Sequence, residues 1–351
     1  MKNIQKILVS LLVSFAISTS AFAGELTVTG TAKATYNTVS GNNDVQNSGA
    51  DTMGITNELT FGANVELDNG WTWKYATELD PDGTAAGGRA INDDTQMVVT
   101  TPYGAFAVCV SECGLSQALE FDQGAYTLVS DTGYAEGKTE PGNISSYTNM
   151  QFHTPAGLLP NEAQVKIAFA PGSNASVASG NAANAANTAT AADSTMVSLT
   201  AVPTEGAKVG VSYMKTEGGE VAGLTDEQDH ESGAVIVTYK YDAFAFGIGK
   251  AYIAPVLADG STDRVENTEN TNYSVGYNVN DNLSVSYTNE KSKNENTTSA
   301  TATTDLKVKS VQAAYTMGGM TVAIAASDYD NVAYVADQNV SEVILAVTMA
   351  F

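Results

Sequence analysis

The sequence predicts an all-β protein, a closed antiparallel transmembrane β-barrel of about 16 strands with short turns at one end and long loops at the other. Three observations predict this fold class. The N-terminus has the pattern of a secreted protein, apolar and polar residues then alternate with a period of two, and the connections between the alternating stretches are short and long in turn.

Residues 1–23 are expected to be a secretory signal peptide. Lys2 and Lys6 precede the apolar stretch 7–17, and the segment ends on the small-residue pattern Ala21-Phe22-Ala23. A membrane anchor would need about 20 apolar residues, whereas this shorter stretch is interrupted by serines. We therefore expect a barrel domain of residues 24–351 that begins at Gly24 after cleavage.

The charge balance excludes one class of partner. Without residues 1–23 the chain has 14 Lys and Arg against 39 Asp and Glu, a net charge of −25. Nucleic acid binding needs clustered Lys and Arg, and the two arginines, Arg89 and Arg264, form no cluster. We expect no nucleic acid partner.

Strands are predicted wherever apolar and polar residues alternate. In 25–36, Leu26, Val28 and Tyr36 share one face while threonines and Lys33 share the other. The same alternation predicts strands at 57–67, 71–79, 95–101, 105–110, 147–153, 164–170, 195–202, 208–214, 234–241, 243–252, 272–279, 283–288, 306–316, 321–327 and 342–351. With the first strand this makes about 16, an even number, as in single-chain outer-membrane barrels.

The connections favour a membrane barrel over a soluble β-sandwich. Seven short turns alternate with eight long polar segments, near 39–53, 80–93, 111–146, 171–194, 216–231, 253–271, 289–305 and 328–341. A sandwich shows no such regular alternation of connection length. An open sheet cannot span a bilayer, so the strands are expected to close, with apolar faces toward lipid and polar faces toward a water-filled lumen.

Four lysines share parity with the polar face and are expected on the pore wall: Lys33, Lys74, Lys166 and Lys208. A lysine on the lipid face near the midplane costs about 2–4 kcal/mol, and in a water-filled lumen it costs little. Snorkelling to an interface is the alternative for each of them. Lys307 and Lys309 share parity with lipid-facing Val311 and are assigned to a strand end outside the lipid.

Several segments resemble the Gram-negative general (trimeric) outer-membrane porins. The C-terminus 341–351, with Val343, Leu345, Val347 and Met349 before a terminal Phe351, resembles the closing strand that the insertion machinery of that family reads. Segments 66–74, 101–108 and 151–157 are similar to hairpins of general porins. The resemblance implies a homotrimer in the outer membrane, with lipid and lipopolysaccharide around it, and a third loop folded into the pore. The family's arginine cluster is absent.

The segment near 111–146 is the longest connection, and the stretch from Glu112 to Ser146 has a net charge of −5. Long loops in compact barrels are usually functional, so the candidate constriction residues are Glu112, Glu120, Asp122 and Asp131. A solvated surface loop is the alternative. Carboxylates around a pore favour cations, and a preference for cations is expected.

Cys109 and Cys113 are the chain's cysteines, and the expected oxidising compartment allows a disulfide between them. Extended strand would hold them too far apart, so a bond requires a turn there. The alternative is two small buried thiols.

The sequence therefore predicts a passive channel for small hydrophilic solutes and ions. The alternative is a plugged or structural barrel with acidic adhesive loops. His153 and His230 are the histidines of the chain, and neither is near a plausible catalytic serine, so no catalytic residues are expected. The acidic clusters lack calcium-loop spacing, and no metal or cofactor is expected.

Overall fold

The structure is a computed structural model that describes residues 25–42, 51–80, 91–110, 119, 122–127, 144, 148–171, 193–217, 226–255, 257–258, 265–296 and 304–351. The expected signal peptide lies outside the described residues, as do Glu112, Cys113, Glu120 and Asp131.

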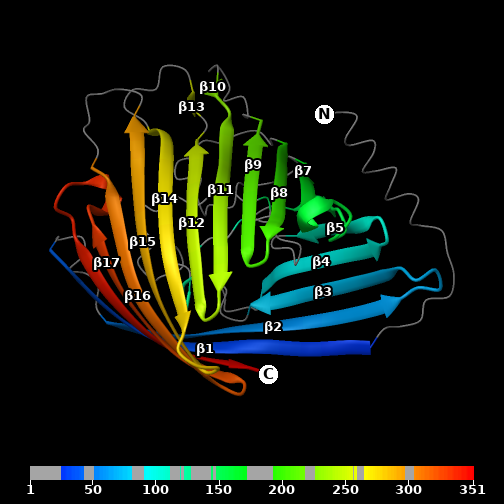
Figure 1. Ribbon diagram of the computed structural model, residues 1–351, viewed down its shortest axis with the longest axis horizontal. Coiled ribbons are helices and arrows are strands. Elements are labelled where there is room, and N and C mark those ends of the chain that lie inside the picture. Colours follow the sequence, from blue (N-terminus) through cyan, green and yellow to red (C-terminus); the bar gives the residue numbers. More distant parts are fainter. Residues whose placement is uncertain are drawn as a thin grey trace.

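Sixteen antiparallel strands form one closed barrel, which confirms the predicted fold class. Each strand pairs with its neighbour in the chain, and β1 pairs with β18 to close the ring. Figure 1 shows β7–β12 running almost across the direction of β1–β5 as the sheet coils. The first eight strands are β1 (Glu25–Gly41), β2 (Thr52–Glu66), β3 (Thr72–Asp80), β4 (Ile91–Thr101), β5 (Gly104–Val110), β6 (Asn149–His153), β7 (Gln164–Ala170) and β8 (Ser194–Thr204). The other eight are β9 (Ala207–Thr216), β11 (His230–Tyr241), β12 (Phe244–Ala254), β14 (Val265–Asn278), β15 (Leu283–Asn296), β16 (Leu306–Met317), β17 (Met320–Asp330) and β18 (Val340–Ala350).

A separate two-stranded sheet, which the sequence did not predict, joins two of the long loops. It pairs β10 (Asp226–Gln228) with β13 (Leu257–Ala258) at the loop end of the barrel (Figure 1). The Gln228 side chain donates to the carbonyl oxygens of Pro255 and Glu266, at 2.7 and 3.0 Å. This sheet ties the β9–β11 connection to the β12–β14 connection.

The alternation of side chains fixes an outer and an inner face for every strand. In β17, Val322 and Ile324 point outward, and Ala323 and Ala325 are buried on the inner face. The pairings carry this parity around the ring: inward Lys33 of β1 pairs with Thr56 of β2 and Thr348 of β18. The inner face is therefore defined continuously from β1 to β18.

The barrel closes at its turn end through the C-terminal residue. The Phe351 N–H donates to the Gly30 oxygen at 3.0 Å, and the Gly30 N–H donates to the Phe351 oxygen at 2.9 Å. A Cβ at position 30 would lie 2.8 Å from the Phe351 ring, so this close approach requires glycine.

Several strands extend farther toward the loop end than the alternation predicted. The predicted starts at 272 and 234 are wrong, because β14 begins at Val265 and β11 at His230. The predicted end at 288 is also wrong, since β15 continues to Asn296. These extensions carry mostly polar residues on both faces, as expected of strand ends that project beyond a bilayer. They therefore have no apolar period.

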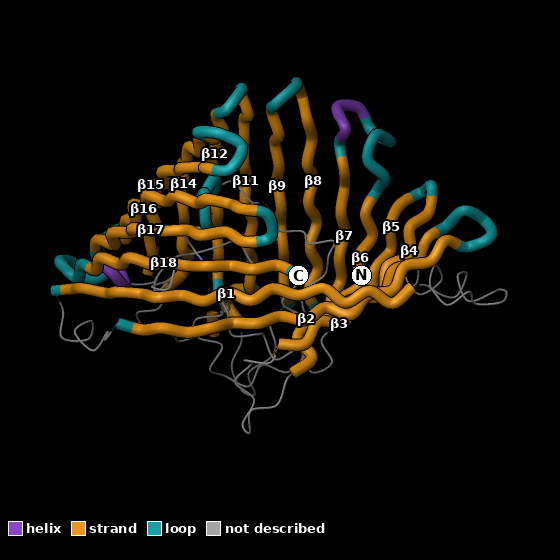
Figure 2. Tube along the Cα trace, turned by 90° about the horizontal axis from the view of Figure 1, so that it is seen from below, coloured by secondary structure: helices purple, strands orange, loops and turns teal. Residues whose placement is uncertain are grey.

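Two short 3-10 helices lie in connections: η3 (Pro160–Glu162) before β7 and η4 (Val332–Tyr334) between β17 and β18 (Figure 2). Among the described residues, no helix is long and apolar enough to cross a membrane.

The two faces predict opposite tolerance for a lysine. Ile324→Lys places a charge on the outer face at the middle of β17, where the side chain is 45% exposed toward lipid. We expect the free energy of unfolding in lipid vesicles to fall by about 2–4 kcal/mol. Thr35→Lys, on the inner face of β1, is the matched control and should change it little. Equal losses from both variants would contradict the assignment of faces.

Candidate functional site

The candidate site is the lumen, in which part of the long connection between β5 and β6 lies against the inner face. Backbone N–H groups of this connection donate to side chains on two strands of the far half of the chain: Gln123 to Ser274 Oγ of β14 at 2.9 Å, and Ala125 to Ser286 Oγ of β15 at 2.8 Å. The described residues 122–127, which we call the lumen segment, are thus inside the barrel.

Gln312 of β16 makes the most extensive of these contacts. Its Oε1 accepts from the N–H groups of Tyr126 and Thr127, at 2.9 and 3.1 Å, and its Nε2 donates to the Thr127 oxygen at 2.9 Å. The Gln312 side chain is buried. A buried amide that satisfies three backbone groups at once holds the lumen segment in one position.

Two glycines leave room for the segment on the inner face. A Cβ at position 276 of β14 would lie 3.2 Å from the Gln123 oxygen. On β9, a Cβ at position 210 would lie 3.1 Å from the Leu119 side chain. The connection therefore lies against β9 and against β14–β16.

Asp122 lies in the lumen, and its carboxylate is bound to the wall. Thr288 Oγ1 of β15 donates to Asp122 Oδ1 at 2.6 Å. The residue is half-buried, so it is bound to the wall and still borders the lumen. The other candidate constriction residues, Glu112, Glu120 and Asp131, lie outside the described residues.

The four pore-wall lysines predicted from parity occupy inward positions in the register. Lys33 pairs with Thr56, Lys74 with Asn64 and Lys208 with Thr238. Lys166 pairs with His153 and Ser198. Lys240 shares the parity of Thr238 and is a fifth inward lysine that sequence reasoning missed, although the same parity argument identifies it. Lys307 and Lys309 face outward, opposite Asp330 and Asp328.

Inward carboxylates on the strands were also missed. Glu290 is buried and accepts from Asn270 Nδ2 at 2.6 Å and Asn272 Nδ2 at 3.2 Å. Glu342 accepts from Asn37 Nδ2 at 2.6 Å and from the Tyr329 hydroxyl at 3.4 Å. These bonds offset the cost of burying the two charges. Both glutamates alternate in phase with polar inward neighbours, so the period of two in the sequence could have identified them as inward residues.

Burial is unequal around the lumen. Inward side chains of β14–β16 are buried, including Asn272, Ser274, Ser286, Thr288 and Gln312. On β2 and β3 inward Ala76 is buried, but several inward side chains are exposed, namely Thr56, Glu58, Asn64 and Lys74. The accessible space of the lumen therefore runs along the wall formed by β1–β3, opposite the docked lumen segment.

His153 is buried on the inner face at the end of β6, within a polar row. Its Nε2 lies 2.9 Å from Gln151 Oε1, and Gln151 Nε2 donates to Asn149 Oδ1 at 2.9 Å. His230 is the first residue of β11. Among the described residues, no group of three or more His, Cys, Asp or Glu is arranged to hold a metal ion.

Cys109 is on the inner face of β5, buried and disulfide-bonded. Cys113 lies outside the described residues, so its pairing with Cys109 stays a prediction. Phe351 closes the barrel as described above, and its side chain is exposed at the turn end.

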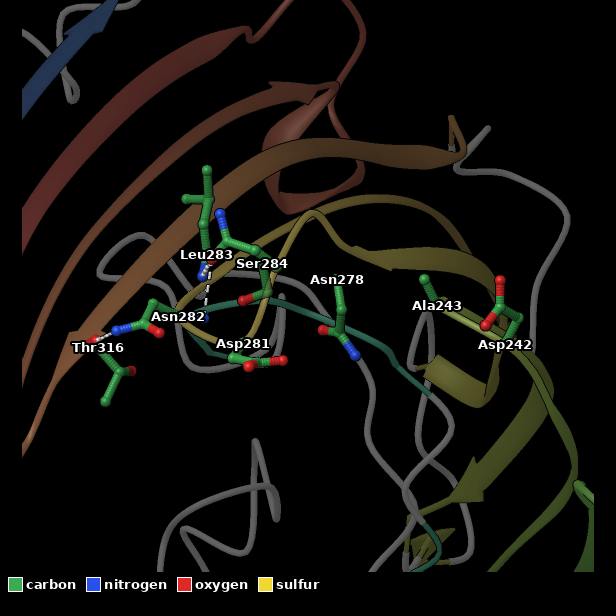
Figure 3. A pocket seen from close by; sticks show the side chains of 9 residues that line it. Asp242, Ala243, Asn278, Asp281, Asn282, Leu283, Ser284 and Thr316 are labelled. Atoms are coloured by element: carbon green, nitrogen blue, oxygen red, sulfur yellow. Dashed lines mark hydrogen bonds between the residues drawn. The ribbon is translucent and has the colours of Figure 1, made fainter.

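A polar pocket of ≈ 390 Å³ lies at the turn end, between the β11–β12 and β14–β15 turns (Figure 3). Its lining includes Asp242, Asp281 and Asn282. Asn282 Nδ2 donates to the Thr316 oxygen at 2.9 Å, and Asn280 Oδ1 accepts from the N–H groups of Asn282 and Leu283. These bonds shape the turns.

Comparison with known proteins adds independent findings. A family model described as Gram-negative porin matches residues 9–348. Similar solved structures include OmpF of Salmonella typhi in complex with daunomycin (13% identity, TM-score 0.66, covering 93% of this chain and 98% of that one). Another is an anion-selective porin of Comamonas acidovorans (11% identity, TM-score 0.64, covering 93% of this chain and 100% of that one). A third is the outer-membrane channel DcaP of Acinetobacter baumannii (13% identity, TM-score 0.61, covering 95% of this chain and 99% of that one). No curated protein sequence matches significantly.

The docking contacts predict that Gln312 controls the position of the lumen segment. Gln312→Leu keeps the bulk and removes all three bonds, so the N–H groups of Tyr126 and Thr127 lose their acceptor. We expect faster hydrogen exchange at these two amides and a noisier open-channel current. Thr348→Ala, on the inner face of β18 opposite Lys33, is the control and should leave both unchanged. Unaltered exchange in Gln312→Leu would mean that other contacts hold the segment.

Proposed function

Because the chain belongs to the family of Gram-negative porins, we propose that its outer-membrane barrel is a passive diffusion channel for small hydrophilic solutes and ions. The observation that carries this proposal is a polar inner face with the lumen segment fastened to one side of it. A segment that lies against one wall narrows the lumen and leaves a path along the other. A plugged structural barrel with adhesive acidic loops is the alternative.

We further propose that the channel prefers cations. The described inward positions of β12 and β14–β18 include no Lys or Arg. They include the buried carboxylates Glu290 and Glu342, and Asp122 of the lumen segment is bound to β15. On the inner face of β2 and β3, exposed Glu58 and Glu66 and half-buried Glu78 share the wall with Lys74 and with Lys33 of the neighbouring β1. Carboxylates that line a path raise the local concentration of cations. The lysines on the remaining strands reduce this preference.

A homotrimer with outer-membrane lipid and lipopolysaccharide around it is proposed as the working assembly. One of the similar solved structures, OmpT of Vibrio cholerae, is described as a trimer form (11% identity, TM-score 0.60). On the outer face, charged residues follow the apolar positions toward the loop end, with ion pairs Lys250–Glu269 at 2.9 Å and Lys291–Asp305 at 2.6 Å. Lysines at this height suit the phosphates of lipid headgroups.

The remaining proposals concern processing and chemistry. We propose that residues 1–23 are removed as a signal peptide and that Cys109 pairs with Cys113 at the root of the long connection. The family supports transport without catalysis, and no cofactor is part of the proposed function.

Conductance in a planar bilayer tests the diffusion function, since a plugged barrel would pass no steady current. Selectivity is tested by Glu120→Gln combined with Asp122→Asn, in which the amide oxygen introduced at position 122 still accepts from Thr288. We expect a smaller cation preference, measured as reversal potential across a salt gradient. The loss should persist at 1 M salt, where the Debye length is about 3 Å and only charges beside the ion act on it.

Neutralisation of Asp226, Glu227 and Asp229 in the β9–β11 connection is the matched control. Asp229 is ion-paired with Lys215 at 2.6 Å, and the group is at the loop end of the barrel. These charges should matter only near 0.01 M salt, where the Debye length is about 30 Å. A reversal potential that is unchanged at both salt concentrations in the Glu120 and Asp122 double variant would contradict the proposed constriction.

A further inference from the structure

Four inward positions at the loop ends of β16, β17 and β18 carry large apolar side chains. Leu306, Val308, Tyr329 and Val340 are each at most 2% exposed. Nearer the turn end, the same strands present Ser310, Gln312, Ser327 and Glu342 to the lumen. Apolar side chains at the mouth of a water-filled lumen are stable only where another part of the chain covers them.

The cover is the connection between β17 and β18, residues 331–339, which we call the outer strap. Val332 is fully buried in the same cluster as the four inward residues, and Tyr334 packs against it. Both belong to η4, which lies beside the loop ends of β18 and β1 (Figure 2). The outer strap thus forms an inner layer on this wall of the mouth.

Hydrogen bonds fasten the outer strap across five strands. The Tyr334 hydroxyl lies 2.8 Å from Ser292 Oγ on the inner face of β15, and Asn331 Nδ2 donates to the Asp305 oxygen at 2.9 Å beside β16. At its other end, Asn42 Nδ2 after β1 donates to the Asp337 oxygen at 2.8 Å. The segment is therefore fixed in place from β15 to β1.

The backbone of the outer strap is held in an unfavourable conformation. Asn331, Ala333, Tyr334 and Asp337 have φ of 61°, 54°, 60° and 65°. Asn and Asp tolerate this left-handed region, whereas Ala and Tyr rarely adopt it. Strain of this kind persists where surrounding contacts determine it, and it is concentrated at functional positions. Here it directs Val332 and Tyr334 toward the wall.

We propose that the outer strap is a second size-limiting element of the channel, at its loop-side mouth and separate from the lumen segment. It admits slender hydrophilic solutes and excludes bulky ones before they reach Asp122. Tyr334 is the specificity-determining residue, because it is the largest side chain of the strap and lies between the apolar cluster and Ser292. This inference rests on the proposed diffusion function.

Exclusion of neutral polyethylene glycols of graded size from single channels tests the proposal. A polymer that enters the pore lowers its conductance, and it is added to one side of the bilayer at a time. For the unmodified channel, polymers of intermediate size should lower conductance less from the loop side than from the turn side. Tyr334→Ala, and separately replacement of residues 332–338 by Gly-Ser-Gly, should shift the loop-side cutoff to larger polymers. The turn-side cutoff should stay unchanged.

Val335→Ser is the matched control, because Val335 is in the same loop and 47% exposed. It should leave both cutoffs unchanged. A folded barrel migrates differently in detergent gels before and after heating, so a variant that lacks this shift has not folded. If one of the two variants does not fold, the other one tests the proposal. Equal cutoffs from both sides in the unmodified channel, or a loop-side cutoff that neither folded variant shifts, would overturn the proposal. A complete lack of conductance would instead overturn the diffusion function.

Discussion

The hydrogen-bonding requirement of a peptide backbone in hydrocarbon determines the rest of this structure. Without water in the bilayer core, every N–H and C=O group of a spanning strand must pair with another strand, so the sheet has to close. Closure here is between β1 and β18, and the chain end itself completes it through Phe351 and Gly30. Once the ring is closed, the inward or outward direction of every side chain follows from the register of its strand.

That direction gives the chain an inner face which its own connections can use. The lumen segment is held chiefly by neutral groups, Ser274, Ser286 and Gln312, which bind its backbone. These three contacts therefore place no charge between the segment and the wall. Asp122 is the exception among the described residues of the segment, since Thr288 binds its carboxylate. The residues that hold the lumen segment in place are thus largely different from those that carry charge in the lumen.

Alternation predicted the strand number and the inward lysines because lipid and water impose opposite demands on successive residues. It failed where both faces meet water, as at the loop ends of β14 and β15, which carry Asn, Glu, Lys and Ser on either face. The docking partners of the lumen segment had no local signal either. Gln312 is 185 residues away from Thr127 in the chain, and only the closed ring brings them together. In the sequence, the apolar residues Leu306 and Val308 interrupt the polar pattern of the inward positions. Their burial is explained only by the fold of residues 331–339, which cover them.

The central claim is that the lumen is open along β1–β3 and filled along β14–β16. Single cysteines treated with a charged methanethiosulfonate reagent during current recording test it directly, with the unmodified channel as the reagent control. Thr56 is exposed on the inner face of β2, and Ser274 is buried beneath the lumen segment. The account predicts that reagent alters the current of Thr56→Cys and leaves that of Ser274→Cys unchanged. A response from Ser274→Cys with none from Thr56→Cys would contradict it.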